Sequence, residues 1–328
     1  MDTSANTKIL KHLMVLNLEV NIWSAQKKLS PSDFGGVKLP PDDLASLGNK
    51  KICNPESLRI FTTLKARAVT MLDRIGVRFL GGWGIPENQA DQVVKELKII
   101  HDEFMEAKDS FLKTYDQNIL DWINQHPEWK NIIKNSTVDA NHVSRRMGFR
   151  WQLYQVVPPK KKSINEGLKD EVSFLGSTLY HEVAKVAEDT WNKCYSGKEK
   201  VSQKAISPLK SIHQKLNGLS FIDPCAAPIA DLMETAFSQI PHKGFIQGAD
   251  LLILHGILAL LRDPDALVRH GNELIKGKTP ESIIQNFSPP EENACPVSLD
   301  DIKADTDLNN PVEGSDIHQE PIESFGLW

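Results

Sequence analysis

The sequence predicts an α+β protein that is mostly α: a long antiparallel helical hairpin of the coiled-coil type, a small three-stranded sheet and a C-terminal helical bundle. Three observations lead to this class. Two long segments repeat apolar residues about every 3.5 positions, three short segments alternate apolar and polar residues, and later segments begin with helix-start signals that contain proline. The 328 residues are 25% charged and 40% hydrophobic, as in soluble globular chains, and they suffice for about two domains or one elongated one.

Three segments, around residues 13–23, 76–84 and 147–157, are the predicted strands. In the first, every second residue is apolar: Met14, Leu16, Leu18, Val20 and Ile22. A period of two places these side chains on one buried face of a strand. The stretch GVRFLGGWG at 76–84 predicts a short strand or hairpin edge. We favour a tight turn over a phosphate-binding loop there, because Glu87 occupies the last glycine position of that motif.

Two long helices, from about 87 to 125 and from about 164 to 194, are predicted to form the hairpin. The apolar residues of the first recur in steps of 4, 3, 4, 3 and 4: Val93, Leu97, Ile100, Phe104, Ala107 and Phe111. This spacing is the coiled-coil repeat. The second helix has a similar seam from Leu168 to Val186. Because each apolar stripe must be buried, the two helices are expected to pair, and a homodimer through the hairpin is a further expectation.

Shorter helices are predicted at 54–75 and 128–135 and in a C-terminal series. Their start signals are Asn54-Pro55, Ser207-Pro208, Asp223-Pro224, Asp263-Pro264 and Thr279-Pro280. The segment 248–261 is the most apolar and is the expected centre of the bundle. The predicted divisions are a strand–helix domain at 1–160, the second long helix at 161–218, a small helical bundle at 219–288 and a disordered acidic tail at 289–328.

The formal net charge of −5 conceals two regions of opposite sign. Residues 289–328 carry −9, with ten acidic residues and one basic residue, so residues 1–288 carry +4. Such composition predicts a disordered tail. Its tip resembles the acidic tails of bacterial single-stranded DNA-binding proteins, which makes Phe325, Leu327 and Trp328 candidate partner-binding residues. Alternatively, the tail only keeps the chain soluble, or it folds onto a basic region and competes with nucleic acid.

The segment 130–169 is strongly basic, with nine basic and two acidic residues. Aromatic residues alternate with its cations, and this combination suits phosphates and stacked bases. The candidate nucleic-acid-binding residues are Arg145, Arg146, Arg150, Trp151, Lys160, Lys161 and Lys162. In the alternative interpretation, Trp151 faces the core and the cations form an ordinary soluble surface.

The sequence shows no recognisable catalytic, metal-binding or cofactor-binding motif. His181-Glu182 begins like a zinc-binding HExxH helix, but Lys185 stands where the second histidine belongs, which predicts an exposed helical pair. His255 lies in the most apolar segment and is predicted to be buried and hydrogen-bonded to a carbonyl, with a ligand or switch role as the alternative. We therefore predict no catalytic residues, no metal and no cofactor, and an enzyme is the less favoured class.

The sequence favours a cytoplasmic protein that does not enter the membrane. No targeting signal is recognised near the N-terminus. The longest apolar run, 251–261, is too short to span a bilayer. The four cysteines lie far apart, without metal or redox spacing, and fit reduced thiols.

Three blocks carry a resemblance to a known family: LNLEVNIWSAQKKL, the stretch from ASLGNKK to GGWGIPE, and KLNGLSFIDP. They resemble the bacterial family catalogued as domain of unknown function 3150, over about residues 10–270. The family has no assigned reaction, so the resemblance implies no site residues. It implies an accessory protein of phage, plasmid or integrative-element gene sets, encoded beside a MoxR-type AAA+ ATPase and a von Willebrand A-domain protein.

Three functions remain open at the level of sequence. The first is a non-enzymatic scaffold or adaptor of a mobile-element system that acts beside an AAA+ ATPase. The second is a nucleic-acid-binding accessory protein that uses the basic segment 130–169. The third is an enzyme of unrecognised type, whose polar residues would have to converge from distant parts of the chain.

Overall fold

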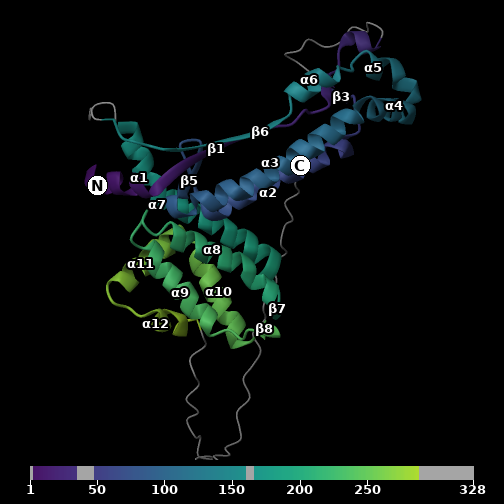
Figure 1. The fold of residues 1–328 in the computed structure, drawn as a ribbon. Coiled ribbons are helices and arrows are strands. Elements are labelled where there is room, and N and C mark those ends of the chain that lie inside the picture. Colours follow the sequence, from purple (N-terminus) through teal and green to yellow (C-terminus); the bar gives the residue numbers. More distant parts are fainter. Residues whose placement is uncertain (1–2, 35–47, 160–165, 288–328) are drawn as a thin grey trace, which may run out of the picture. The chain divides into compact units, whose positions relative to one another are not determined.

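Residues 3–34, 48–159 and 166–287 are described by a computed structural model of the protein (Figure 1). The chain divides into two units, residues 1–289 and 290–328, and every described residue belongs to the first. This unit is α+β and mostly helical with a small antiparallel sheet, as the sequence predicts. Its buried apolar residues form two clusters, and both of them include residues of the sheet.

The main sheet has four antiparallel strands in the order β4–β5–β1–β6. Their bounds are Leu13–Asn21 for β1, Val77–Phe79 for β4, Gly82–Pro86 for β5 and Gly148–Gln155 for β6. The prediction of three strands is wrong because the segment 76–84 spans a hairpin. The chain reverses at Leu80-Gly81, and two short strands replace the single predicted one.

The β4–β5 hairpin explains the glycines of this segment. Leu80 and Gly81 have φ angles of 50° and 75°, and a two-residue type I′ turn requires positive φ at both positions. At Gly82, a Cβ atom would lie 2.2 Å from Asn17 Oδ1 and 2.4 Å from the Leu16 carbonyl oxygen. Only glycine therefore lets β5 approach β1 this closely. The predicted tight turn is confirmed.

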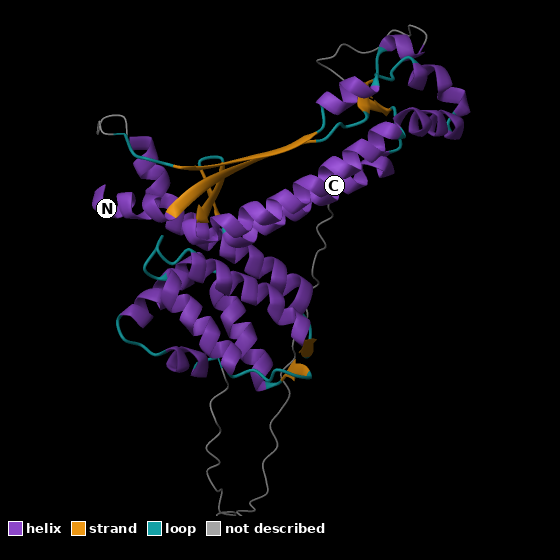
Figure 2. Ribbon diagram, viewed as in Figure 1, coloured by secondary structure: helices purple, strands orange, loops and turns teal. Residues whose placement is uncertain are grey.

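The first hydrophobic cluster, which we call the α3 cluster, contains one face of the sheet, two long helices and buried residues between 115 and 147. Helix α2 (Arg59–Ile75) follows a 3₁₀ turn whose Asn54 side chain accepts a hydrogen bond from Glu56 N at 3.0 Å. Helix α3 (Ala90–Lys113) follows the β4–β5 hairpin, and β1 and β6 run along it (Figure 2). The Phe61 and Phe104 rings meet edge to face at 5.0 Å between the two helices.

The second cluster, which we call the α7 cluster, is built from α7 and the helices that follow it. Helix α7 (Glu166–Thr190) continues into a π-helical turn at Trp191–Tyr195. The later helices are α8 (Ser207–Gly218), α9 (Ala226–Ser238), α10 (Ala249–Leu261), α11 (Pro264–Ile275) and α12 (Pro280–Gln285). Strands β7 (Lys200–Ser202) and β8 (Phe245–Gln247) pair beside them.

The remaining elements are short, apart from α1. They are α1 (Thr3–His12), β2 (Gln26–Lys28), β3 (Asn49–Lys51), α5 (Lys130–Lys134) and α6 (Ala140–Arg145), with 3₁₀ turns at Pro31–Phe34, Glu87–Gln89, Pro127–Trp129 and Gln203–Ile206. β2 and β3 form a separate two-stranded sheet.

The predicted long hairpin is not observed. The segment 87–125 is two helices, because α3 ends at Lys113 and α4 (Tyr115–Gln125) begins after Thr114. α3 packs mainly on α2 and β6, whereas α7 packs mainly on β4, α8 and α1. The 3.5-residue stripe of α3 is buried as expected, but the sheet and α2 cover it. An apolar stripe on a helix must pack against another element, but the stripe does not specify whether that element is a helix or a sheet.

A buried lysine joins the two clusters. The Lys215 side chain of α8 is only 7% exposed, and its ammonium group donates hydrogen bonds to Glu182 Oε2 and to the Asp73 carbonyl oxygen, each at 2.7 Å. Glu182 lies on α7, and its Oε1 accepts a hydrogen bond from Arg78 N at 2.9 Å. Asp73 Oδ1 on α2 accepts hydrogen bonds from Arg78 and from Trp83 Nε1. We call this set the Lys215 network.

We expect Lys215→Met to lower the free energy of unfolding by about 3 kcal/mol, because it leaves the largely buried Glu182 carboxylate without its counter-ion. Urea unfolding monitored by circular dichroism measures the change. Lys210→Met is the matched control, because Lys210 is an exposed lysine of the same helix. It should change the free energy by no more than about 0.5 kcal/mol. Equal effects of the two substitutions would contradict a structural role for the network.

Candidate functional site

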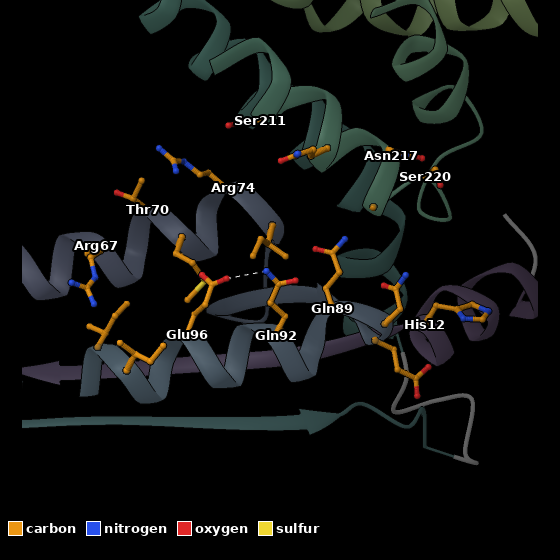
Figure 3. Close-up of a pocket in the computed structure, with 18 of the residues that line it drawn as sticks. His12, Arg67, Thr70, Arg74, Gln89, Gln92, Glu96, Ser211, Asn217 and Ser220 are labelled. Atoms are coloured by element: carbon orange, nitrogen blue, oxygen red, sulfur yellow. Dashed lines mark hydrogen bonds between the residues drawn. The ribbon is translucent and has the colours of Figure 1, made fainter. Parts of the chain in front are cut away.

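A groove of 1480 Å³ lies between α2, the start of α3 and α8 (Figure 3). Each helix contributes a row of side chains at helical spacing. The row on α2 is Thr63, Ala66, Arg67, Thr70 and Arg74; the row on α3 and the preceding turn is Gln89, Gln92, Glu96 and Ile99; the row on α8 is Ser211, Gln214 and Asn217. His12 of α1 and Phe221 after α8 complete one end.

Nine of the groove-lining residues carry an uncharged amide or hydroxyl side chain, and the others include apolar and charged residues. These amides and hydroxyls offer both donors and acceptors. One of them, Gln92, donates to Glu96 Oε1 at 3.0 Å within α3. Ile99 adds an apolar contact surface, since its side chain is 58% exposed. The groove can therefore bind a mixed polar and apolar surface.

The charged groups of the groove are of both signs. Arg67 makes a bidentate ion pair with Glu103, with N–O distances of 2.6 and 2.8 Å, and these hydrogen bonds lower the pKa of the Glu103 carboxyl below its usual range. Arg74 is exposed and has no ion pair with a described residue. Glu87 and Glu96 face the same space. No cluster of His, Cys, Asp and Glu among the described residues is arranged to hold a metal ion.

The structure separates the predicted nucleic-acid-binding residues. Arg145 and Arg146 line a second cavity of 530 Å³. Arg150 is on the outer face of β6, where it donates to Glu19 Oε1 at 3.0 Å. Trp151 is on the opposite face, half-buried, with its ring 5.7 Å from that of His101 on α3. The placement of Trp151 follows the alternative interpretation, in which this ring packs inward.

The remaining predicted site residues lie outside the described residues. They are Lys160, Lys161, Lys162, Phe325, Leu327 and Trp328. Their roles stay predictions.

Sequence reasoning missed the groove because no single segment carries its signal. Each row is indistinguishable from the solvent face of an ordinary amphipathic helix. Only the packing of α2 against α3 and α8 brings the rows together. The same holds for Lys27, which lines the second cavity with Arg145 and Arg146 although more than a hundred residues separate them.

Comparison with known families matches residues 10–263 to the family described as Protein of unknown function (DUF3150). The chain belongs to this family. The matched region contains the four-stranded sheet, the whole groove and the Lys215 network. No curated protein and no solved structure matches the chain. Within the described residues of this DUF3150 member, no helix is both long and apolar enough to cross a membrane.

In this DUF3150 protein, Glu182 and His255 have surroundings that differ from those predicted. His181 is exposed, as expected, but Glu182 is 77% buried and belongs to the Lys215 network. His255 Nε2 is buried and has no hydrogen-bond partner among the described residues, so this atom does not bond to a carbonyl as predicted. The His255 ring packs edge to face on Trp191 and Tyr195 of the π-helical turn, and burial lowers its pKa.

We expect His255 to make the DUF3150 protein less stable in acid. Because its folded-state pKa lies below the usual value of about 6.5, the unfolded chain binds the proton first, and stability is lost as pH falls from about 7 toward the folded-state value. His255→Phe keeps an aromatic ring and removes the titrating group. Urea midpoints at neutral and mildly acidic pH should therefore fall less in the variant than in the wild type. An identical fall in both would contradict this assignment.

Proposed function

We propose that this protein is a non-enzymatic adaptor that binds a segment of a partner protein in the groove between α2, α3 and α8. The observation that carries the proposal is the size and lining of the groove. Pockets for small molecules usually measure about 300–1,000 Å³ and contain only a few polar groups. This one measures 1480 Å³, and nine amide or hydroxyl side chains and charges of both signs lie beside its apolar residues.

The charges of the groove favour protein over nucleic acid as the occupant. Arg67 is already neutralised by Glu103, and Glu87 and Glu96 would repel phosphates. A polypeptide can instead pair its own charges of both signs and its main-chain groups with the amides, while an apolar side chain contacts Ile99. These properties match the polar rim and apolar contacts of protein–protein interfaces.

The Lys215 network supports the proposal because it connects two walls of the groove. Lys215 lies between groove-lining Gln214 and Asn217 on α8, and it binds the carbonyl oxygen of Asp73, next to groove-lining Arg74 on α2. The groove therefore has a preformed width. Preorganised surfaces lose less entropy on binding, which increases affinity.

The identity of the partner is the finer part of the proposal. Because of the family resemblance of the sequence blocks described above, we propose that the partner is an AAA+ ATPase encoded in the same phage, plasmid or integrative element. Both proteins would act in the cytoplasm. The adaptor would present its groove to the ATPase without turnover of its own. A dimer of the adaptor is compatible with this arrangement and is not required by it.

We expect Gln214→Trp to abolish capture of the partner, because the indole fills the groove from an exposed position that the fold does not need. The measurement is a tagged pull-down from the native host, with nuclease treatment and quantification of the captured protein. Gln117→Trp is the matched control, since Gln117 is an exposed glutamine of α4 that does not line the groove. Undiminished capture by Gln214→Trp would rule out the groove as the binding site.

Deletion of Ser324–Trp328 tests the predicted recruiting tail in the same assay. If the apolar tip binds a pocket of the partner, its loss should weaken capture by about tenfold, which corresponds to 1.4 kcal/mol. Mutation of Glu320 and Glu323 to Gln, which keeps the tip, should produce a smaller, salt-dependent loss. Unchanged affinity after the deletion would eliminate the tail as a recruiter without affecting the groove proposal.

A further inference from the structure

A second site lies in the cavity of 530 Å³ between the end of β1, β2 and α6. It is lined by Asn21, Ile22, Trp23, Ser24, Gln26, Lys27, Ile52, Val138, His142, Arg145 and Arg146. Three of these are cations and one is a histidine, and the described lining contains no carboxylate. The cavity shares no lining residue with the groove.

The cations of this cavity are available to a ligand. Lys27, Arg145 and Arg146 are exposed, and none has an ion pair with a described residue. Basic residues near a helix C-terminus also interact favourably with the helix dipole, which explains Arg145 in the last turn of α6 and Arg146 at its C-cap. It does not explain Lys27, which comes from β2 and converges on the same cavity.

The positive charge continues beyond the cavity along the β2–β3 sheet. Lys28 and Lys51 are exposed and have no ion pair with a described residue, and Lys51 pairs in register with Gln26 of the cavity. Lys50 is different, because it forms a short ion pair with Asp33 and is mostly buried. Exposed cations from β2, β3 and the end of α6, without ion pairs to described residues, suit a chain of phosphates rather than a single one.

We propose that this cavity and the adjoining β2–β3 lysines bind the phosphodiester backbone of a nucleic acid, with Lys27, Arg145 and Arg146 as the main phosphate contacts. The polar lining, with Asn21, Ser24 and Gln26, supplies additional donors to phosphate and sugar oxygens. The site makes contacts to backbone rather than to base edges, so it binds without sequence preference. It does not depend on the groove, and the two proposals fail independently.

The experiment measures binding of a fluorescein-labelled 20-nucleotide single-stranded DNA to the full chain by fluorescence polarisation, over a series of salt concentrations. Lys27→Ala/Arg145→Ala/Arg146→Ala should raise the Kd by about tenfold or more. It should also make the slope of the logarithm of the binding constant against the logarithm of the salt concentration shallower by about 2. Each lost phosphate contact on a single strand contributes about 0.7 to this slope. Each single substitution should give about one third of the change in slope.

The matched control is Lys204→Ala/Lys210→Ala/Arg269→Ala, which removes the same net charge from exposed residues of the α7 cluster region. Its Kd should stay within a factor of about two of the wild-type value, because only the long-range effect of the changed net charge acts on it. Far-UV circular dichroism confirms that all variants fold. Equal losses in the two triple variants would overturn the site, because net charge alone would then account for binding.

Two competitors distinguish other ligands of the same charge. Displacement of the DNA by excess adenosine monophosphate would show a pocket for a single phosphate group and would overturn the proposal of a backbone site. Displacement by polyglutamate at equal charge concentration would show a docking site for acidic protein instead. Absence of wild-type binding at low salt would also overturn the proposal. Resistance to both competitors, together with the loss in the cavity variant, supports it.

Discussion

The arrangement of this protein depends on the burial of one ammonium group. Transfer of a lysine from water to a protein interior costs several kcal/mol unless hydrogen bonds and a counter-ion replace the water. Lys215 meets this requirement only where Glu182 of α7 and the Asp73 carbonyl of α2 are both within reach, each at 2.7 Å. Because the two acceptors lie on different clusters, the cost of burial restricts how α2, α7 and α8 can be placed. The width of the groove follows from that restriction.

Strand β1 connects the two clusters through apolar contacts, as the Lys215 network does through polar ones. Leu13 and Val15 belong to the α7 cluster, whereas Leu16 and Val20 belong to the α3 cluster. Alternation along a strand normally separates a buried face from a wet one. Here the face that carries Leu13 and Val15 is also buried. The next residue on that face is the polar Asn17, which Gly82 of β5 approaches closely. One strand therefore contributes to both cores, and neither cluster could lose β1 without exposing apolar surface.

Local signals were sufficient for much of this fold. The caps at Asn54, Asp263 and Thr279 each accept the hydrogen bond that such residues favour, and the helices begin next to them. The period-two pattern located β1 and β6. Pairing was not predictable, because a seam such as that of α3 is satisfied equally by a helix or a sheet. The groove rows and Lys27 were missed for the same reason: their meaning depends on neighbours that are distant in sequence.

The two candidate sites differ in charge, and the fold explains how both can belong to one protein. The groove contains amides and charges of both signs, whereas the described lining of the cavity near α6 contains cations and no carboxylate. Nine residues of β1 extend over about 30 Å. His12, which immediately precedes β1, lines the groove, and Asn21 at the end of the strand lines the basic cavity. A protein segment in one site and a nucleic acid in the other would thus be connected through a single strand. In that arrangement, the rigidity of the sheet, rather than a moving domain, determines the spacing between the two ligands.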